Sequence, residues 1–475
     1  MDEAHYSDYD GIGLAALIRS GAVSAHEVLD TAIARVEALN PALNAVVYKA
    51  YDDARRGLAD GIDGPFSGVP FLIKDLGCPV AGMPMTQGSR YYRDYRPAED
   101  CDLAAAYRAA GLVIIGKSNT PEFGISGTAE SARLGACRNP WNTDRISGGS
   151  SGGAAAAVAS GMVPVAHASD GAGSIRLPAA MSGVFGLKPS RGRVRPTVRR
   201  GDALHSFSCN HVLSRSVRDS AAMLDATLDR RNPYAPTMPA RPFLDEVSAP
   251  PGRLRIAFSA ERPSGEAPKS FMVEALHRVA GQLADLGHDV EERPIPLHFQ
   301  PFYGAFATVA AARFAAQMDA AADLLGRTPE PDELEPVTWV RWERGRGKTG
   351  AEVAAALEVL ASEGRIVTDF FDDVDVFLNP VMADTVPAVG HLDPVAVAPD
   401  EHSRRSGYVL FMTLPFNATG QPAMSVPMGR DHDGMPLGFH FVGRYGDEAT
   451  LLRLAAQLEE AHPWQIERPP LWRSA

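Results

Sequence analysis

The chain has only four cysteines in 475 residues, and none of them belongs to a CxxC pair. Cysteines this sparse exclude a disulfide framework in a chain of this length, so we expect buried thiols at Cys78, Cys101, Cys137 and Cys209. The 13 histidines show no HExxH, HxH or mixed Cys/His spacing. The sequence therefore predicts no metal site, and it implies no organic cofactor.

Long apolar runs are also absent. The longest runs are rich in alanine, carry charge or Gly and Pro, and are shorter than a membrane span requires. The N-terminus, MDEAHYSDYD, is acidic and lacks the apolar core of a secretory signal. The formal net charge of −12 disfavours a nucleic-acid partner. With 45% hydrophobic residues, the composition fits a cytoplasmic enzyme with a sizeable core and no membrane partner.

Strands and helices alternate along the first half. Ser24 and Glu27 form a capping box before a helix that we expect to end ahead of Pro41. Short apolar runs predict strands over 68–75, 112–119 and 162–170, the first of them ending at Lys74. Helical segments over 101–111 and 154–161 lie between these runs. This alternation predicts an α/β fold.

The second half continues the pattern with a more variable part. We expect strands over 253–259, 289–295, 374–381, 422–429 and 437–444, and helices over 269–287, 303–325 and 448–461. No repeat of fixed period and no low-complexity linker interrupts the chain. We therefore expect one domain over residues 1–475, with a core over 60–220 and a more variable substrate-side region over 228–400.

The segment GGSSGG, residues 148–153, permits several interpretations. A phosphate-binding loop would need a lysine after the glycines, where this chain has four alanines. The segment matches the G-x-S-x-G nucleophile elbow, but that motif follows a strand directly, and here NPWNTDRIS precedes it. A purely structural turn also fits the local sequence.

A second serine points to hydrolytic chemistry. Ser174 follows Gly171, Ala172 and Gly173, whose successive backbone N–H groups suit a developing oxyanion. A serine nucleophile needs a base, and burial would lower the pKa of Lys74 at the end of its strand. The alternatives are a tight turn at Ser174 and a salt bridge in the sequence IKD.

Taken together, these segments resemble the amidase signature family. The resemblance rests on GGSSGG, DGAGSIRLPA (170–179) and VPFLIKD (69–75), with GKSNTPEFG, NPWN, GVFGLKPSRGRV, PFNATGQPAMSVPMG and GMPLGFHFVG around them. It spans nearly the whole chain and is strongest over 60–220. It implies a large, mixed, twisted central sheet that helices cover on both faces.

The resemblance also implies roles for individual residues. Ser174 matches the acylated nucleophile, Ser150 the bridging serine after a cis peptide bond, and Lys74 the general base. The backbone N–H groups of Gly171, Ala172, Gly173 and Ser174 match the oxyanion hole. Ser151, Asp170 and Arg176 match supporting positions.

Two positions depart from the family pattern. Ala172 stands where glycine is usual, which keeps the N–H group but restricts the backbone. His440 stands where glutamine is common, and we interpret it as a hydrogen-bonded histidine in the sheet or as a pocket residue. The resemblance places Gly124, Ile125 and Ser126 in the acyl pocket. Phe306 and Phe314, on the helix over 303–325, either form its other side or pack in the core.

Several segments resemble the branch with hydrolases of nylon-derived cyclic oligomers, among them HASDGAGSIRLPA and the tail HPWQIERPPLW. That branch implies small alkyl or aryl amide substrates, with carbamates (urethanes) and esters open to the same chemistry, and a monomer or homodimer. The alternative is a glutamine-hydrolysing subunit similar to the A subunit of a tRNA-dependent amidotransferase. The apolar Ile125 disfavours it.

A basic stretch could suggest a nucleic-acid binder, but it lacks interleaved aromatic residues and the chain is acidic. Solvated turns and pairing with carboxylates explain it better. The residues concerned are Lys188, Arg191, Arg193, Arg195, Arg199 and Arg200.

Overall fold

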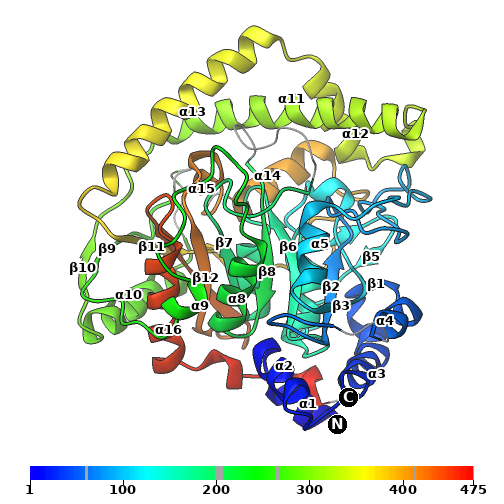
Figure 1. Cartoon of the computed structure of the whole chain (residues 1–475). Coiled ribbons are helices and arrows are strands. Elements are labelled where there is room, and N and C mark those ends of the chain that lie inside the picture. Colours follow the sequence, from blue (N-terminus) through cyan, green and yellow to red (C-terminus); the bar gives the residue numbers. More distant parts are fainter. Residues whose placement is uncertain (59–61, 198–206, 263–264, 266–267, 411, 474–475) are drawn as a thin grey trace.

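A computed structural model describes residues 1–58, 62–197, 207–262, 265, 268–410 and 412–473 (Figure 1). Within these residues an 11-stranded sheet has the order β1-β3-β2-β6-β8-β7-β12-β13-β11-β9-β10, and β4 (Glu130–Ser131) pairs with β5 (Gly135–Ala136). The strands of the large sheet are β1 (Val46–Lys49), β2 (Val69–Lys74), β3 (Leu112–Ser118), β6 (Val165–Asp170), β7 (Phe185–Lys188), β8 (Cys209–Ser214), β9 (Arg255–Phe258), β10 (Asp289–Glu292), β11 (Val376–Pro380), β12 (Ala423–Arg430) and β13 (Pro436–Gly443).

The large sheet is mixed. Strand β2 runs parallel to both β3 and β6, and β9 runs parallel to β10 and β11. Between these two parallel parts, β6, β8, β7, β12, β13 and β11 pair antiparallel. The α/β fold with a mixed central sheet is therefore confirmed, and most of the predicted strands lie within a few residues of their expected bounds.

The α-helices of the described residues are α1 (Glu3–Asp8), α2 (Gly11–Arg19), α3 (Ala25–Leu43), α4 (Tyr51–Leu58), α5 (Asp102–Ala109), α6 (Gly152–Ala159), α7 (Arg176–Ser182), α8 (Val217–Thr227), α9 (Phe243–Glu246), α10 (Ser270–Asp285), α11 (Phe299–Leu325), α12 (Pro336–Arg346), α13 (Gly350–Phe370), α14 (Pro399–Leu410), α15 (Pro415–Thr419) and α16 (Glu448–Ala461). Short 3-10 helices span Glu122–Gly124, Pro331–Glu333, Trp464–Ile466 and Pro470–Arg473.

Strand β2 shows why helices cover both faces of the sheet. All six of its residues are buried, and successive side chains of a strand point to opposite faces. Leu72 packs in a core with α3 and α6. Phe71 and Ile73 pack in a second core, which contains residues of α2, α5 and α8. A strand buried on both faces reads as a continuous apolar run, which is how this one appears in the sequence.

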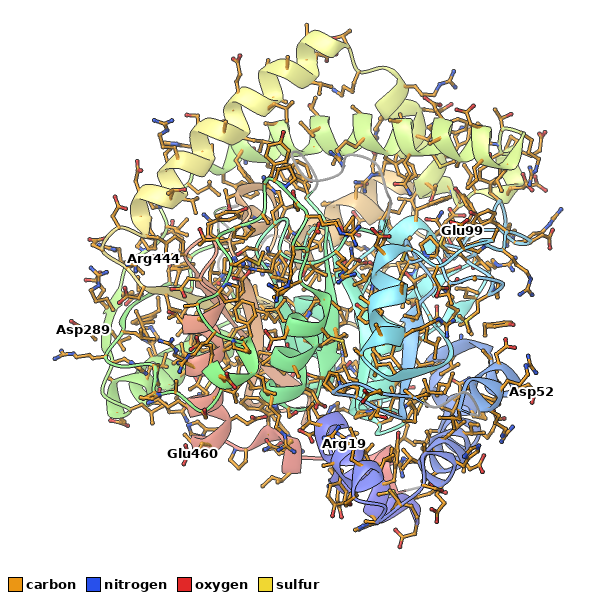
Figure 2. All side chains as sticks on the ribbon, in the orientation of Figure 1. Arg19, Asp52, Glu99, Asp289, Arg444 and Glu460 are labelled. Atoms are coloured by element: carbon orange, nitrogen blue, oxygen red, sulfur yellow. The ribbon has the colours of Figure 1, made fainter. Side chains whose placement is uncertain are left out.

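Helices α11, α12 and α13 lie across the ends of the central strands and form a roof over them (Figure 1). Phe306 of α11 packs in a cluster that includes Ala172, just beyond the end of β6. Phe314 of the same helix packs against Phe123. The region over 228–400 therefore supplies the roof. Figure 2 shows charged side chains such as Arg19, Asp52 and Glu99 pointing outward from the molecule.

Helix α3 begins as predicted and ends later than predicted. The capping box of Ser24 and Glu27 is present. The expectation that the helix ends ahead of Pro41 is wrong, because it continues to Leu43. A proline fits in a last turn because its φ is already helical, at the loss of one backbone hydrogen bond. The Asn40 side chain joins this turn to β1 through two hydrogen bonds with the backbone of Val46, at 2.8 and 2.9 Å.

All four cysteines are buried free thiols, as expected. Cys78 Sγ lies 3.6 Å from Cys101 Sγ, a contact without a covalent bond. Within the described part of the chain, no helix combines the length and the apolar character needed to cross a membrane.

Two glycines give opposite expectations for the same substitution. A Cβ on Gly438 of β13 would lie 2.3 Å from Ala180 Cβ, whereas a Cβ on Gly281 of α10 would meet no atom within 4 Å. Gly438→Ala should therefore lower the free energy of unfolding by about 1–3 kcal/mol through overpacking. Gly281→Ala should raise it by about 0.5–1 kcal/mol, because alanine favours a helix interior. Urea unfolding of both variants measures the change in the free energy of unfolding. Equal changes for the two variants would contradict the close packing of Gly438 in β13.

Candidate active site

Lys74 ends β2 and is fully buried. Its Nζ donates hydrogen bonds to three serine hydroxyls, at 2.7 Å to Ser150 Oγ, 2.9 Å to Ser151 Oγ and 3.0 Å to Ser169 Oγ. Burial lowers the pKa of Lys74 to about 7, although the Asp170 carboxylate acts in the opposite direction. The amine is therefore close to half neutral at neutral pH, and its contacts are hydroxyls rather than a carboxylate.

The glycine-serine turn carries Ser150 and Ser151 to this lysine. It leads directly into α6, and the peptide bond between Gly149 and Ser150 is cis. A Cβ on Gly149 would lie 2.4 Å from Thr128 N, so only glycine fits there. Ser151 Oγ also donates to Ser169 O at 3.2 Å. No strand directly precedes the turn, which agrees with the argument against a nucleophile elbow.

Ser174 lies in the loop between β6 and α7 and is 7% exposed. The described residues give its Oγ no hydrogen bond. Within the same described part, the backbone N–H groups of Gly171, Ala172 and Ser174 have no acceptor. The Gly173 N–H differs, because it donates to Asp170 Oδ1 at 2.7 Å. Gly173 itself has a φ of +137°, and a Cβ there would lie 2.2 Å from Thr413 Oγ1.

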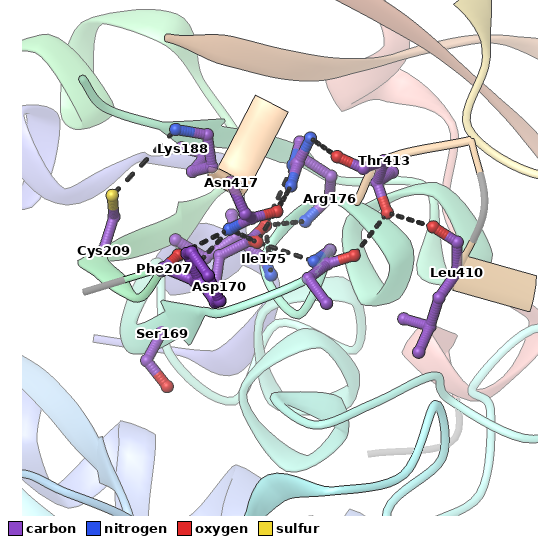
Figure 3. Close-up of polar contacts among 12 residues, drawn as sticks. Ser169, Asp170, Ile175, Arg176, Lys188, Phe207, Cys209, Leu410, Thr413 and Asn417 are labelled. Carbon is purple, nitrogen blue, oxygen red and sulfur yellow. Dashed lines mark hydrogen bonds and ion pairs between the residues drawn. The ribbon is translucent and has the colours of Figure 1, made fainter. Parts of the chain in front are cut away.

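A buried ion pair holds this loop. Arg176 donates to both carboxylate oxygens of Asp170, through Nη2 and Nε, each at 2.9 Å (Figure 3). Neither side chain is exposed. Burial alone would raise the pKa of Asp170, but the charge and hydrogen bonds of Arg176 hold it well below its usual range. The ionised carboxylate also accepts from the N–H of Ile175 at 3.1 Å.

Residues from the C-terminal part complete this network (Figure 3). Asn417 Nδ2 donates to Asp170 O and to Asp170 Oδ1, both at 2.9 Å. Thr413 Oγ1 donates to Ala172 O at 2.6 Å, which holds the residue where the family pattern has glycine.

His440 lies behind Arg176, in β13, and is fully buried. Its Nε2 lies 2.9 Å from Arg176 Nη1, and its Nδ1 lies 2.9 Å from Asn379 Oδ1. A guanidinium only donates, so Nε2 accepts and Nδ1 carries the proton. Burial, and then the Arg176 charge, holds the pKa of His440 well below its usual range. His440 is thus a neutral, hydrogen-bonded histidine of the sheet.

A cavity of about 1760 Å³ contains the two serines and all three expected pocket residues. Ser150, Ser174, Gly124, Ile125 and Ser126 line it. Ser126 Oγ also lies 3.2 Å from His402 Nε2 of α14.

Phe306 and Phe314 of α11 line the cavity from the roof. Phe306 stacks on Phe207 at 4.6 Å between ring centroids, and Phe314 meets Phe123 edge to face at 5.7 Å. Both phenylalanines are less than 9% exposed. They therefore pack in the core and form the cavity wall at the same time.

The basic stretch is used inside the fold. Arg193 forms a buried ion pair with Glu448 at 2.8 Å, and Lys188 Nζ donates to Pro189 O at 2.9 Å. Arg191 Nη2 donates to Asn417 O at 3.0 Å, and Arg195 Nε to Leu228 O at 3.4 Å. Arg199 and Arg200 lie outside the described residues. In the described residues, no group of three or more His, Cys, Asp or Glu side chains could hold a metal ion.

The structure adds site residues that the sequence analysis did not single out. Ser169 is the third hydroxyl on Lys74, and it directly precedes Asp170 in the quoted motif. His167 Nδ1 accepts from the Lys74 backbone N–H at 3.3 Å. Asn417 belongs to the quoted segment PFNATG. Their position beside recognised motifs was the available signal, but nothing local indicates what each one contacts.

Comparison with known proteins identifies the family of the chain. Residues 27–452 match the Amidase family. The chain is 38% identical over 477 residues to the 6-aminohexanoate-cyclic-dimer hydrolase of Paenarthrobacter ureafaciens, covering 97% of this chain and 96% of that protein.

Two solved structures are similar over nearly their whole length. A 6-aminohexanoate cyclic dimer hydrolase complexed with substrate has a TM-score of 0.93 at 36% identity, covering 98% of this chain and 99% of that chain. A bacterial aryl acylamidase of the amidase signature family has a TM-score of 0.87 at 26% identity, covering 98% of both chains. With an α/β sheet, a buried lysine among serines and this full-length similarity, the chain belongs to the amidase signature family and is an amidase, a hydrolase of carbon–nitrogen bonds.

Proposed function

We propose that the chain hydrolyses small alkyl or aryl amides through an acyl-enzyme on Ser174, with Ser150 as proton relay and Lys74 as base. The observation that supports this most is the 2.7 Å hydrogen bond from buried Lys74 to Ser150, in the wall of the cavity that also contains Ser174. A serine hydroxyl is a weak nucleophile until a base takes its proton.

The first step moves two protons. Neutral Lys74 accepts the proton of Ser150 Oγ, which in turn accepts the proton of Ser174 Oγ. The freed electron pair of Ser174 forms a bond to the amide carbonyl carbon, and the π pair moves to the carbonyl oxygen. Ser174 has no competing hydrogen bond in the described residues, so its hydroxyl is free to turn toward Ser150 when substrate binds.

The loop before Ser174 stabilises the negative charge that forms on the carbonyl oxygen. The N–H groups of Gly171, Ala172 and Ser174 are the available donors. The Gly173 N–H already bonds Asp170, so its contribution is to hold the loop rather than to bind the oxyanion. Ala172 fits this role because the donor is its backbone.

The second half of the reaction uses the same relay. The protonated lysine returns its proton through Ser150 to the leaving nitrogen, and the carbon–nitrogen bond breaks. Water then attacks the acyl carbon while Ser150 and Lys74 take its proton, and the relay returns that proton to Ser174 Oγ as the bond from the acyl carbon to Ser174 breaks. A hydroxyl both accepts and donates, so Ser150 serves each half-reaction without a histidine.

The cavity favours small apolar groups around the scissile bond. Ile125, Phe306 and Phe314 contribute apolar surface to its lining. The names of the similar proteins point to a cyclic amide and to aryl amides as their substrates. Carbamates and esters present the same carbonyl to Ser174, so urethanes belong to the proposed class. Glutamine hydrolysis is the alternative, and it would need partner chains to use the ammonia.

Ser174→Ala should abolish turnover. We expect kcat for a fatty amide, an anilide, a nitrophenyl ester and an aryl carbamate to fall by a factor on the order of 10⁴ or more, because the acyl-enzyme cannot form. Ser403→Ala is the matched control, since Ser403 lines the same cavity and its hydroxyl, among the described residues, bonds only to Pro399 O, at 2.8 Å. Glutamine in the same panel distinguishes the proposed amidase from the alternative, a glutamine-hydrolysing subunit. Substantial turnover by Ser174→Ala, or glutamine as the one substrate cleaved, would overturn the proposal.

The pH profile should report Lys74. Its pKa is about 7 and the neutral amine is the base, so kcat/KM for a non-ionisable anilide should rise tenfold per pH unit below about pH 7 and level off above it. Lys74→Met should lower kcat/KM by roughly 10²–10⁴-fold and remove this acid limb. Rates from about pH 5 to 9 test both expectations. A flat wild-type profile would argue against a lysine base.

A further inference from the structure

Arg341 of α12 has no polar partner among the described residues, unlike Arg191, Arg195 and Arg344 of the same cavity wall. It is half-buried and lines the cavity. In the described part of the chain its guanidinium makes neither a hydrogen bond nor an ion pair, and its aromatic contact is with Phe314, at 5.8 Å from the ring centroid. Arg344, one turn further along α12 and also in the cavity wall, pairs with Asp400 at 2.6 Å.

This arrangement is costly for the free protein. A charge taken out of water is normally paired, and a guanidinium keeps its proton in proteins. Burial lowers the pKa of Arg341, and Tyr303 alone acts in the opposite direction. No carboxylate of the described residues pairs with the Arg341 charge. A half-buried cation that lines a cavity without a partner among the described residues is suited to receive one from a ligand.

One path along the cavity wall from Ser150 to Arg341 is apolar, through Phe123 and Phe314. Gly124 adjoins Ser150, since a Cβ on Gly124 would lie 3.1 Å from Ser150 Oγ. The preceding residue, Phe123, meets Phe314 at 5.7 Å, and Phe314 carries the guanidinium of Arg341 over its ring. A substrate that lies along this wall therefore meets aromatic surface first and a cation beyond it.

We propose that Arg341 binds a carboxylate at the far end of the acyl chain of the substrate. The planar fork of a guanidinium matches a carboxylate through two parallel hydrogen bonds. The inference rests on the proposed hydrolysis at Ser174 and narrows its substrates to amides whose acyl part is apolar near the carbonyl and anionic at its end. Arg341 is thus a specificity residue rather than a part of the proton relay.

The test uses pairs of p-nitroanilides. One member of each pair is the monoanilide of succinic, glutaric, adipic or suberic acid, and the other has an isopropyl group in place of the carboxylate. At one chain length, wild-type kcat/KM should favour the carboxylate member by roughly 10- to 100-fold, the usual value of a charged hydrogen bond. The best length then reports the distance from Ser174 to Arg341.

Arg341→Gln should remove this preference, chiefly through KM, and change the neutral member by less than about 3-fold. Arg341→Lys keeps the charge without the fork and should restore part of the preference. Arg344→Gln is the matched control and should leave the ratio unchanged. Because the guanidinium has no polar partner among the residues that the structure describes, the thermal midpoint of Arg341→Gln should equal or exceed that of the wild type.

Binding to the Ser174→Ala protein separates this inference from the proposed reaction. Calorimetry with the same pairs should show tighter binding of the carboxylate member, and Arg341→Gln in that background should abolish the difference. If the wild type cleaves neither member but this binding difference holds, the proposed reaction fails and the anion site stands. Equal binding of both members, or an equal effect of Arg341→Gln on both, would overturn the anion site alone.

Discussion

The ion pair of Asp170 and Arg176 is the constraint on which the site depends. A buried pair adds little to stability by itself, since desolvation offsets most of the attraction. Here its value is geometric. The carboxylate accepts from the backbone of Gly173 and Ile175, so the loop on either side of Ser174 is tied to one fixed charge. His440 Nε2 accepts from Nη1 of the same guanidinium, which joins the loop to β13, an inner strand of the same sheet.

Lys74 shows the opposite use of burial. Asp170 stays ionised because a cation and several donors contact it directly, whereas Lys74 lies among neutral hydroxyls. A hydroxyl accepts a hydrogen bond from an ammonium without balancing its charge, so desolvation dominates and the pKa falls to about 7. Two buried ionisable groups next to one loop thus have different roles: one holds the backbone, and the other is free to gain or lose a proton.

The sequence predicts the sheet and the motif residues because both depend on short segments. The run from Val69 to Lys74 is apolar throughout, which is the pattern of a strand buried on both faces. The segments that resemble the amidase signature family point to Lys74, Ser150 and Ser174, and the structure brings these segments together at one cavity. The end of α3 could not be predicted, because Pro41 stays helical through contacts of the last turn with β1. The hydrogen bond from the Gly173 N–H to Asp170 could not be predicted either, because it depends on the geometry of the loop and not on the spacing of residues in the sequence.

The cavity wall was the least predictable part, and the reason is physical. The phenylalanines of α11 repeat at helical spacing, which is the same pattern whether they face a core or a ligand. Arg341 appears in the sequence as one of several charged residues in WVRWERGRGK (339–348), and such residues are usually solvated. Its proposed role depends on the lack of a hydrogen-bond or ion-pair partner among the described residues. That lack can be seen only in the structure, where α12 packs against α11 beside the cavity. The proposed catalytic residues therefore lie at the ends of inner strands, in motifs that the sequence reveals. The residues proposed to select the substrate lie in the helical roof, and their roles depend on packing.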